Sequence, residues 1–143
     1  MFIGEYSHTI DKKKRLAIPS KFRKELGKKA VITRELDNCL VIYPLSEWQE
    51  KAEKLGNLPK AQIDARKFAR IMLAGAMDVN LDSLGRILVP DYLKKYASLK
   101  KKVVITGLFN RLEIWDEKRW EEYKKETETA VGDIAGRLKE LGV

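Results

Sequence analysis

Few of the residues that build disulfide frameworks, metal sites and catalytic centres occur in this chain. Cys39 is the single cysteine among 143 residues, and His8 is the single histidine. A lone cysteine excludes an internal disulfide framework and a cysteine-based zinc site. His8 lies inside an expected strand, with no clustered acid or Ser–His pairing for acid–base or nucleophilic chemistry. We therefore expect no enzyme activity, no cofactor and no metal.

Long apolar runs are also missing. No stretch approaches the roughly 18 residues of a membrane span, and the first residues, MFIGEYSH, lack the basic-then-apolar pattern of a signal peptide. No Gly-rich phosphate loop occurs. With 44% hydrophobic and 35% charged residues, the chain is globular in composition. These features predict a cytoplasmic protein with no membrane partner.

Positive charge is abundant and unevenly distributed. The net charge is +8, which suggests an anionic partner, with nucleic acid ahead of membrane lipid. Residues 1–35 hold ten Lys and Arg against four Asp and Glu, whereas residues 116–143 hold six against eight. Most of the positive field therefore belongs to the first quarter of the chain.

An internal repeat explains the organisation. The stretch TIDKKKRLAIP (Thr9–Pro19) recurs in altered form as NLDSLGRILVP (Asn80–Pro90), with an offset of 71 between matching positions. Farther along, VIT at Val31–Thr33 matches VIT at Val104–Thr106, and NCLVIYPLSEW matches NRLEIWDEKRW at an offset of 72. The chain is a tandem duplication, and each copy ends in a helical segment.

The pattern of apolar and turn residues in each copy predicts four short strands and intervening helices. The expected strands are Glu5–Ile10, Arg15–Ile18, Ala30–Thr33 and Leu40–Tyr43, then Met77–Leu81, Arg86–Val89, Val103–Thr106 and Leu112–Trp115. Pro19 and Pro90 are expected in the first turn of a short helix. Ser46 with Gln49 resembles a capping box, and Asp116 is a candidate helix cap. A further helix is expected from Gln62 to Leu73, and a weaker one from Thr127 to Leu141.

The fold class predicted from these elements is α+β. Four short strands form a marginal core alone, so we expect the two copies to pack together into a small barrel-like β core with peripheral helices. The expected divisions are a first repeat with its helix at 1–55, a linker and helix at 56–71, a second repeat with its helix at 72–126, and a C-terminal helix at 127–143.

The repeated turn has two interpretations. Asp11 and Asp82 suit a turn because a carboxylate accepts nearby backbone N–H groups, and Arg15 and Arg86 could pair with them and only lock the hairpin. Alternatively, the turns face DNA, and both roles can coexist because a guanidinium has five donors. We expect Asp11, Asp82, Pro19 and Pro90 to be architectural.

The DNA-facing interpretation assigns a role to each basic residue. Lysines on a flexible turn neutralise phosphates without sequence preference, whereas arginine at the rigid base of the turn could contact guanine O6 and N7 or clamp a phosphate. The candidate DNA-binding residues are Lys12, Lys13, Lys14, Arg15, Arg86, Lys21, Arg23 and Lys24. An ordinary solvated surface is the alternative for each lysine and for the short helix.

These residues resemble a known family. MFIGEYSHTIDKKKRLAIPSKFRKEL together with LDSLGRILVP, and the YPLSEW and IWDEKRW segments, are similar to the MraZ family of bacterial transcriptional regulators of the division and cell-wall gene cluster. The resemblance covers essentially the whole chain. It implies tandem AbrB-like (swapped-hairpin) units, homo-oligomeric rings, and binding to repeated sites in the protein's own promoter, hence a nucleoid location. It also implies that Arg15, Arg86 and the neighbouring basic residues face double-stranded DNA.

One position departs from the family pattern, which has glycine before the first arginine as Gly85 precedes Arg86. Lys14 stands there, so a turn that requires a positive φ would be mildly strained. Two alternatives to a DNA-binding regulator stay open: a protein-interaction or scaffold module, and an RNA-binding regulator. Trp48, Trp115 and Trp120 could stack on single strands, although aromatic residues that match between repeats favour core or subunit-interface positions.

Overall fold

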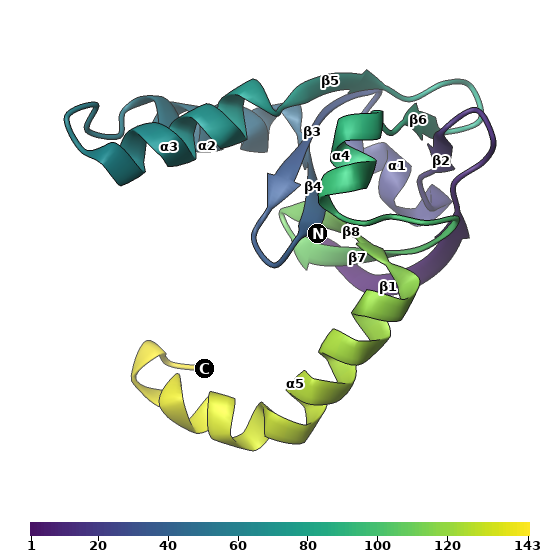
Figure 1. Cartoon of the computed structure of the whole chain (residues 1–143). Helices are drawn as coiled ribbons and strands as arrows, with labels where there is room; N and C mark the ends of the chain where they lie inside the picture. Colours follow the sequence, from purple (N-terminus) through teal and green to yellow (C-terminus); the bar gives the residue numbers. More distant parts are fainter.

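The computed structural model describes residues 1–143 and has a mixed α+β architecture with antiparallel strands, as the sequence predicts (Figure 1). Four strands come from each copy of the repeat, in the same order. They are β1 (Phe2–Thr9), β2 (Arg15–Ala17), β3 (Lys29–Glu35), β4 (Cys39–Pro44), β5 (Met77–Asn80), β6 (Arg86–Leu88), β7 (Lys102–Phe109) and β8 (Arg111–Asp116). All eight expected strands are therefore present.

Along the chain, the helices follow pairs of strands. They are α1 (Ser20–Leu26), α2 (Leu45–Gly56), α3 (Ile63–Ala74), α4 (Asp91–Tyr96) and α5 (Glu117–Arg137), followed by the short 3-10 helix η1 (Lys139–Leu141). None of these helices is long and apolar enough to cross a membrane.

Strands are exchanged between the two copies. The six-stranded sheet has the order β1-β7-β8-β4-β3-β5, so the first strand of each copy pairs with the third strand of the other. β4 and β8 join the two halves at the centre of the sheet. β2 and β6 pair with each other and form a separate two-stranded ribbon, and Leu16 of β2 also forms one isolated bridge with Ile10. The copies therefore share one folded unit, because neither has its own complete sheet.

The hydrophobic core lies between the large sheet and the ribbon, with α1 and α4 at its sides. Twenty buried residues from both copies form one cluster, in which Leu16 and Ile18 of the first copy match Ile87 and Val89 of the second. Burial of each such side chain stabilises the fold by about 1.5–3 kcal/mol. The ribbon is thereby fixed to the core through its inner face, which leaves its outer face for other contacts.

The observed helix starts match those predicted from the sequence only in part. Pro19 and Pro90 immediately precede α1 and α4, and Asp116 caps α5 by accepting a hydrogen bond from the backbone N–H of Arg119 at 3.4 Å, as predicted. The capping box at Ser46 is wrong. α2 begins at Leu45 directly after Pro44 with no side-chain cap, so Ser46 already lies inside the helix.

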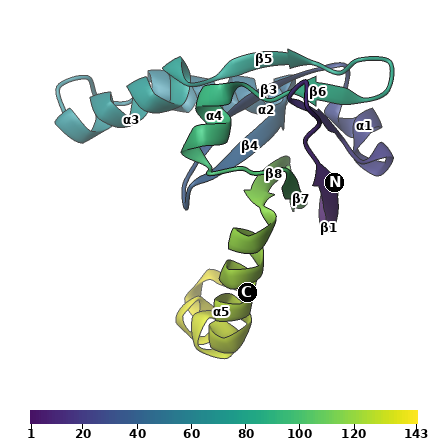
Figure 2. The same cartoon turned by 45° about the vertical axis from the view of Figure 1, so that its right-hand side comes forward.

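Two helical arms project from the β core. α2 and α3 pack together as one arm, and α5 extends from the end of β8 as the other (Figures 1 and 2). The weaker helix expected from Thr127 to Leu141 is instead the second half of α5, which continues through Gly132 and Gly136 to Arg137. An isolated glycine costs an exposed helix about 1 kcal/mol, which the other residues of a 21-residue helix can offset.

Candidate nucleic-acid interface

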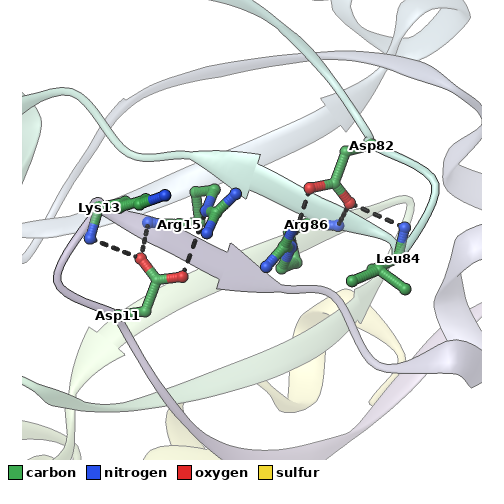
Figure 3. Close-up of polar contacts among 6 residues, drawn as sticks. All are labelled: Asp11, Lys13, Arg15, Asp82, Leu84 and Arg86. Carbon is green, nitrogen blue, oxygen red and sulfur yellow. Dashed lines mark hydrogen bonds and ion pairs between the residues drawn. The ribbon is translucent and has the colours of Figure 1, made fainter.

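The β2/β6 ribbon brings the two repeated turns together. The strands are antiparallel, with Arg15 opposite Leu88 and Ala17 opposite Arg86, so the two turns lie at opposite ends of the ribbon. Because side chains alternate along a strand and Leu16 is buried, Arg15 and Arg86 share the outer face. Figure 3 shows the two arginines between the strands, each flanked by the aspartate of its own turn.

Each turn is a tight hairpin whose backbone closes on itself. In the first, the N–H of Lys14 donates to the carbonyl of Asp11 at 3.0 Å, and the N–H of Asp11 donates to the carbonyl of Arg15 at 3.0 Å. In the second, Gly85 donates to Asp82 at 2.9 Å, and Asp82 donates to Arg86 at 2.9 Å. This is a type I turn followed by a bulge residue in the left-handed region.

The bulge residue differs between the two turns but its conformation does not. Lys14 has φ 65° and Gly85 has φ 75°. The positive φ expected at Lys14 is therefore present, and it carries the cost of a left-handed conformation for a residue with a Cβ atom, about 1–2 kcal/mol. The matching backbone hydrogen bonds mean that lysine in place of glycine leaves the turn closed in the same way.

The aspartate carboxylates organise both turns. One oxygen of Asp11 accepts the backbone N–H groups of Lys13 and Arg15, both at 2.9 Å, and the other accepts the Arg15 Nε–H at 3.3 Å. Asp82 makes the same contacts with the N–H groups of Leu84 and Arg86, and its Arg86 Nε contact is 2.8 Å (Figure 3). Hydrogen bonds from the backbone N–H of each arginine are the largest cause that lowers the pKa of each aspartate.

The arginines are held through one edge only. Nε of Arg15 and Nε of Arg86 point to the aspartates, while no side-chain Nη atom of either residue donates a hydrogen bond within the chain. Locking the turn and facing a ligand are therefore compatible here, since each guanidinium keeps its two Nη groups for a planar acceptor pair.

The two turns differ in the side chains that contact their bulge residues, Lys14 and Gly85. Lys14 Nζ contacts Asp91 at the start of α4 at 2.6 Å. At the second turn, Arg23 of α1 donates from Nε to the carbonyl of Ile18 at 2.8 Å and lies across Gly85, where a Cβ atom would collide with the guanidinium. Each bulge residue thus contacts the short helix of the other copy.

The remaining candidate residues lie in three places. Lys12 and Lys13 are exposed at the tip of the first turn. Lys21 lies over the rings of Tyr6 and Phe22, with Nζ 5.9 and 6.0 Å from their centroids. Arg23 and Lys24 lie beside the second turn, where they line a hollow of about 580 Å³ together with Gly27, Lys28, Leu81, Asp82, Ser83 and Gly85.

Some basic residues near the turns were not among the sequence predictions. Lys28 lines the hollow beside the second turn, and the carbonyl of Lys101 accepts the N–H of Ile10 just before the first turn at 2.8 Å. The offset of 73 that matches VIT at Val31–Thr33 and Val104–Thr106 also relates Lys28 to Lys101. That match was available from the sequence, whereas the proximity of each loop to the other copy's turn depends on the strand exchange.

The aromatic residues pack against one another on the far face of the sheet. Trp115 lies 5.4 Å from Trp120 and 4.8 Å from Tyr123, and Tyr43 lies 6.0 Å from Trp48, measured between ring centroids. Such contacts indicate packing roles. No group of three or more His, Cys, Asp or Glu side chains is placed to hold a metal ion.

Comparison with known proteins gives one consistent match. The family model described as "MraZ protein, putative antitoxin-like" matches residues 1–71 and again residues 72–139. The chain is 49% identical to a protein of Moorella thermoacetica and 47% identical to proteins of Caldanaerobacter subterraneus subsp. tengcongensis and Clostridium tetani, each named "Transcriptional regulator MraZ". Every one of these matches covers all 143 residues of this chain and the whole of the relative.

Proposed function

Because the chain belongs to the MraZ family, we propose that it is a transcriptional regulator that binds repeated sites in its own promoter through the β2/β6 ribbon. The observation that carries the proposal is the pair Arg15 and Arg86, which share the outer face of the ribbon with their Nη groups unpaired. A regulator of this kind acts in the cytoplasm at the nucleoid.

The dimensions of the ribbon suit the major groove of DNA, which is about 12 Å wide and admits a two-stranded β-ribbon. Arg15 and Arg86 are diagonal neighbours in the ribbon, a relationship that separates residues by about 7–8 Å. Base pairs rise by about 3.4 Å each, so the two arginines span about two base-pair steps, and each suits a guanine.

The aspartates explain how the arginines would read bases. A guanidinium whose Nε is already bound has a fixed plane, so its Nη pair can approach guanine O6 and N7 with less loss of side-chain freedom. A good bidentate contact discriminates against a wrong base by about 1–3 kcal/mol. Lys12 and Lys13, which are exposed at the tip of the first turn, would add phosphate contacts without sequence preference.

The test is binding to the DNA upstream of this protein's own gene. Arg15→Ala and Arg86→Ala should each reduce affinity for that DNA by about 10-fold or more and reduce its preference over scrambled duplex. Lys54→Gln, an exposed change on α2, is the matched control and should bind like the unchanged chain. Unchanged affinity and selectivity in Arg15→Ala would refute the proposal. Stronger competition by equimolar RNA than by duplex DNA would favour an RNA-binding regulator.

We extend the proposal to the assembly: the chain has AbrB-like, swapped-hairpin repeats at 1–55 and 72–126 and assembles into a homo-oligomeric ring. The exchange of β1 and β5 between the copies supports the first part. The second part is supported by the C-terminal segment: α5 has no buried residue, and Val131 in α5, Leu138 directly after it and Leu141 in η1 are all exposed. With Ile134 they follow the 3-4-3 spacing of an apolar helix stripe, which a second chain would cover.

The arm formed by α2 and α3 offers the matching surface, since Ile63 and Ile71 of α3 are also exposed. A contact between different surfaces of identical chains closes into a ring when the rotation allows it. Val131→Asp with Leu138→Asp should therefore lower the mass of the particle measured by light scattering. Thr129→Asp with Gly136→Asp, on the opposite side of the same helix, should leave that mass unchanged. A low mass in the unchanged chain would refute the ring and leave DNA binding open.

A further inference from the structure

Each repeated turn is bordered by basic residues of the other copy. The last turn of α1 carries Arg23 and Lys24, and the loop after it carries Lys28, whose carbonyl accepts the N–H of Leu81 at 2.8 Å. Leu81 directly precedes Asp82, so this loop is hydrogen-bonded to the base of the second turn. The three basic residues and the turn together line the hollow of about 580 Å³.

The first turn has the equivalent neighbours. The last turn of α4 carries Lys94 and Lys95, and the loop after it carries Lys101, the equivalent of Lys28. The carbonyl of Lys101 accepts the N–H of Ile10, the residue before Asp11, at 2.8 Å. The contact between Lys14 and Asp91 joins α4 to the same turn. The strand exchange therefore repeats one arrangement at both ends of the ribbon.

The basic residues that lie beside each turn, called its border below, carry unpaired positive charge. No ion pair within the chain involves any of the six basic residues, Arg23, Lys24, Lys28, Lys94, Lys95 and Lys101. The carboxylate that lines the hollow at the second turn, Asp82, already accepts two backbone N–H groups and the Nε–H of Arg86. At the second turn, three cations therefore surround a hollow whose one carboxylate is already engaged, an arrangement that favours an anion.

We propose that these two borders hold the DNA phosphates that flank the bases read by the ribbon, with Arg23, Lys24 and Lys28 at the second turn and Lys94, Lys95 and Lys101 at the first. The inference depends on the DNA binding proposed above. A ribbon in the major groove has a phosphate backbone on each side, and cations at both ends of the ribbon lie where those backbones pass. Each copy thus supplies the base-reading arginine of one turn and the phosphate-holding cations of the other turn.

The first experiment measures affinity for promoter DNA against salt concentration. Lys24→Gln with Lys28→Gln should weaken binding to promoter and scrambled duplex by the same factor. It should also reduce the slope of log K against log salt by about 1.8, since each phosphate contact contributes about 0.9. Between about 50 and 200 mM salt, the variant should lose about 12-fold less affinity than the unchanged chain does. Lys54→Gln with Lys125→Gln, which removes two exposed lysines from the helical arms, should keep the slope of the unchanged chain.

The second experiment assigns each border to a turn by ethylation interference, in which ethylated phosphates that block binding are mapped. Lys24→Gln with Lys28→Gln should abolish interference beside the base whose selectivity Arg86→Ala relaxes. Lys94→Gln with Lys101→Gln should abolish it beside the base whose selectivity Arg15→Ala relaxes. The opposite assignment, or an unchanged salt slope in a chain that still binds its promoter, would overturn this inference alone. Absence of duplex binding by the unchanged chain would instead overturn the proposed function.

Discussion

Arg23 of α1 covers Gly85 of the second turn, whereas the equivalent bulge residue of the first turn, Lys14, reaches away to Asp91. Both bulge residues have a positive φ. Glycine therefore suits its position in two ways, because it adopts a positive φ without strain and leaves space for the guanidinium of Arg23. Lys14 adopts the same backbone conformation at a cost and makes a different contact.

This relationship predicts unequal effects of substitution at the two turns. Gly85→Ala should destabilise the fold by about 2 kcal/mol, because the left-handed conformation costs a Cβ-bearing residue about 1–2 kcal/mol and Arg23 must move from its bond to Ile18. Lys14→Gly should change stability by less than about 1 kcal/mol, because relief of the same strain is offset by the freedom of glycine in the unfolded chain. Urea unfolding at fixed protein concentration measures both. Equal losses in the two variants would contradict the account.

The three lysines of the first turn should contribute unequally to DNA binding. Lys12 and Lys13 are exposed with no acidic partner, whereas Lys14 is paired with Asp91. Lys12→Gln with Lys13→Gln should lower the slope of log K against log salt by about 1.8, and adding Lys14→Gln should lower it little further. Equal decrements for all three lysines would show that Lys14 leaves Asp91 when DNA binds.

The turn aspartates predict an acid-sensitive contribution to stability. Hydrogen bonds from backbone N–H groups and the paired arginines hold the pKa of Asp11 and of Asp82 below the ordinary value near 3.9. The folded state then binds protons less readily than the unfolded chain, so the contribution is complete above about pH 4 and is lost as the pH falls through the lowered pKa. Asp11→Ala with Asp82→Ala should therefore make the thermal midpoint less dependent on pH below about pH 4. Asp78→Ala, at an exposed strand position, is the control and should leave the pH dependence unchanged.

Much of the fold was predictable because the repeat doubled each local signal. Alternating apolar residues and the flanking prolines located all eight strands, and the Asp and Arg spacing located both hairpins. Strand pairing was not predictable in the same way. β3 and β7 carry the same VIT sequence at Val31–Thr33 and Val104–Thr106, so local pattern does not distinguish which of them β1 should join.

The position of the basic residues depended on that pairing. The sequence places Arg23 and Lys24 soon after the first turn, yet the exchange of β1 and β5 brings them beside the second. Their proximity to Asp82 is a tertiary contact between residues nearly 60 positions apart, and no local signal encodes it. The weaker helix expected from Thr127 proved to be part of the continuous α5, because the rest of the helix offsets the cost of Gly132 and Gly136.

The last prediction concerns Cys39, the only thiol. Its side chain is fully buried in β4, and Sγ donates to the carbonyl of Leu36 at 3.4 Å. Burial, reinforced by the nearby Glu113 carboxyl, raises the pKa of the Cys39 thiol, so the reactive thiolate is suppressed. Iodoacetamide at about pH 8 should leave the native chain unmodified by mass spectrometry and should modify it fully in urea. The model thiol glutathione, alkylated in the same tube, controls for reagent activity. Rapid modification of the native chain would mean that the β3–β4 hairpin opens locally, at a free energy below that of global unfolding.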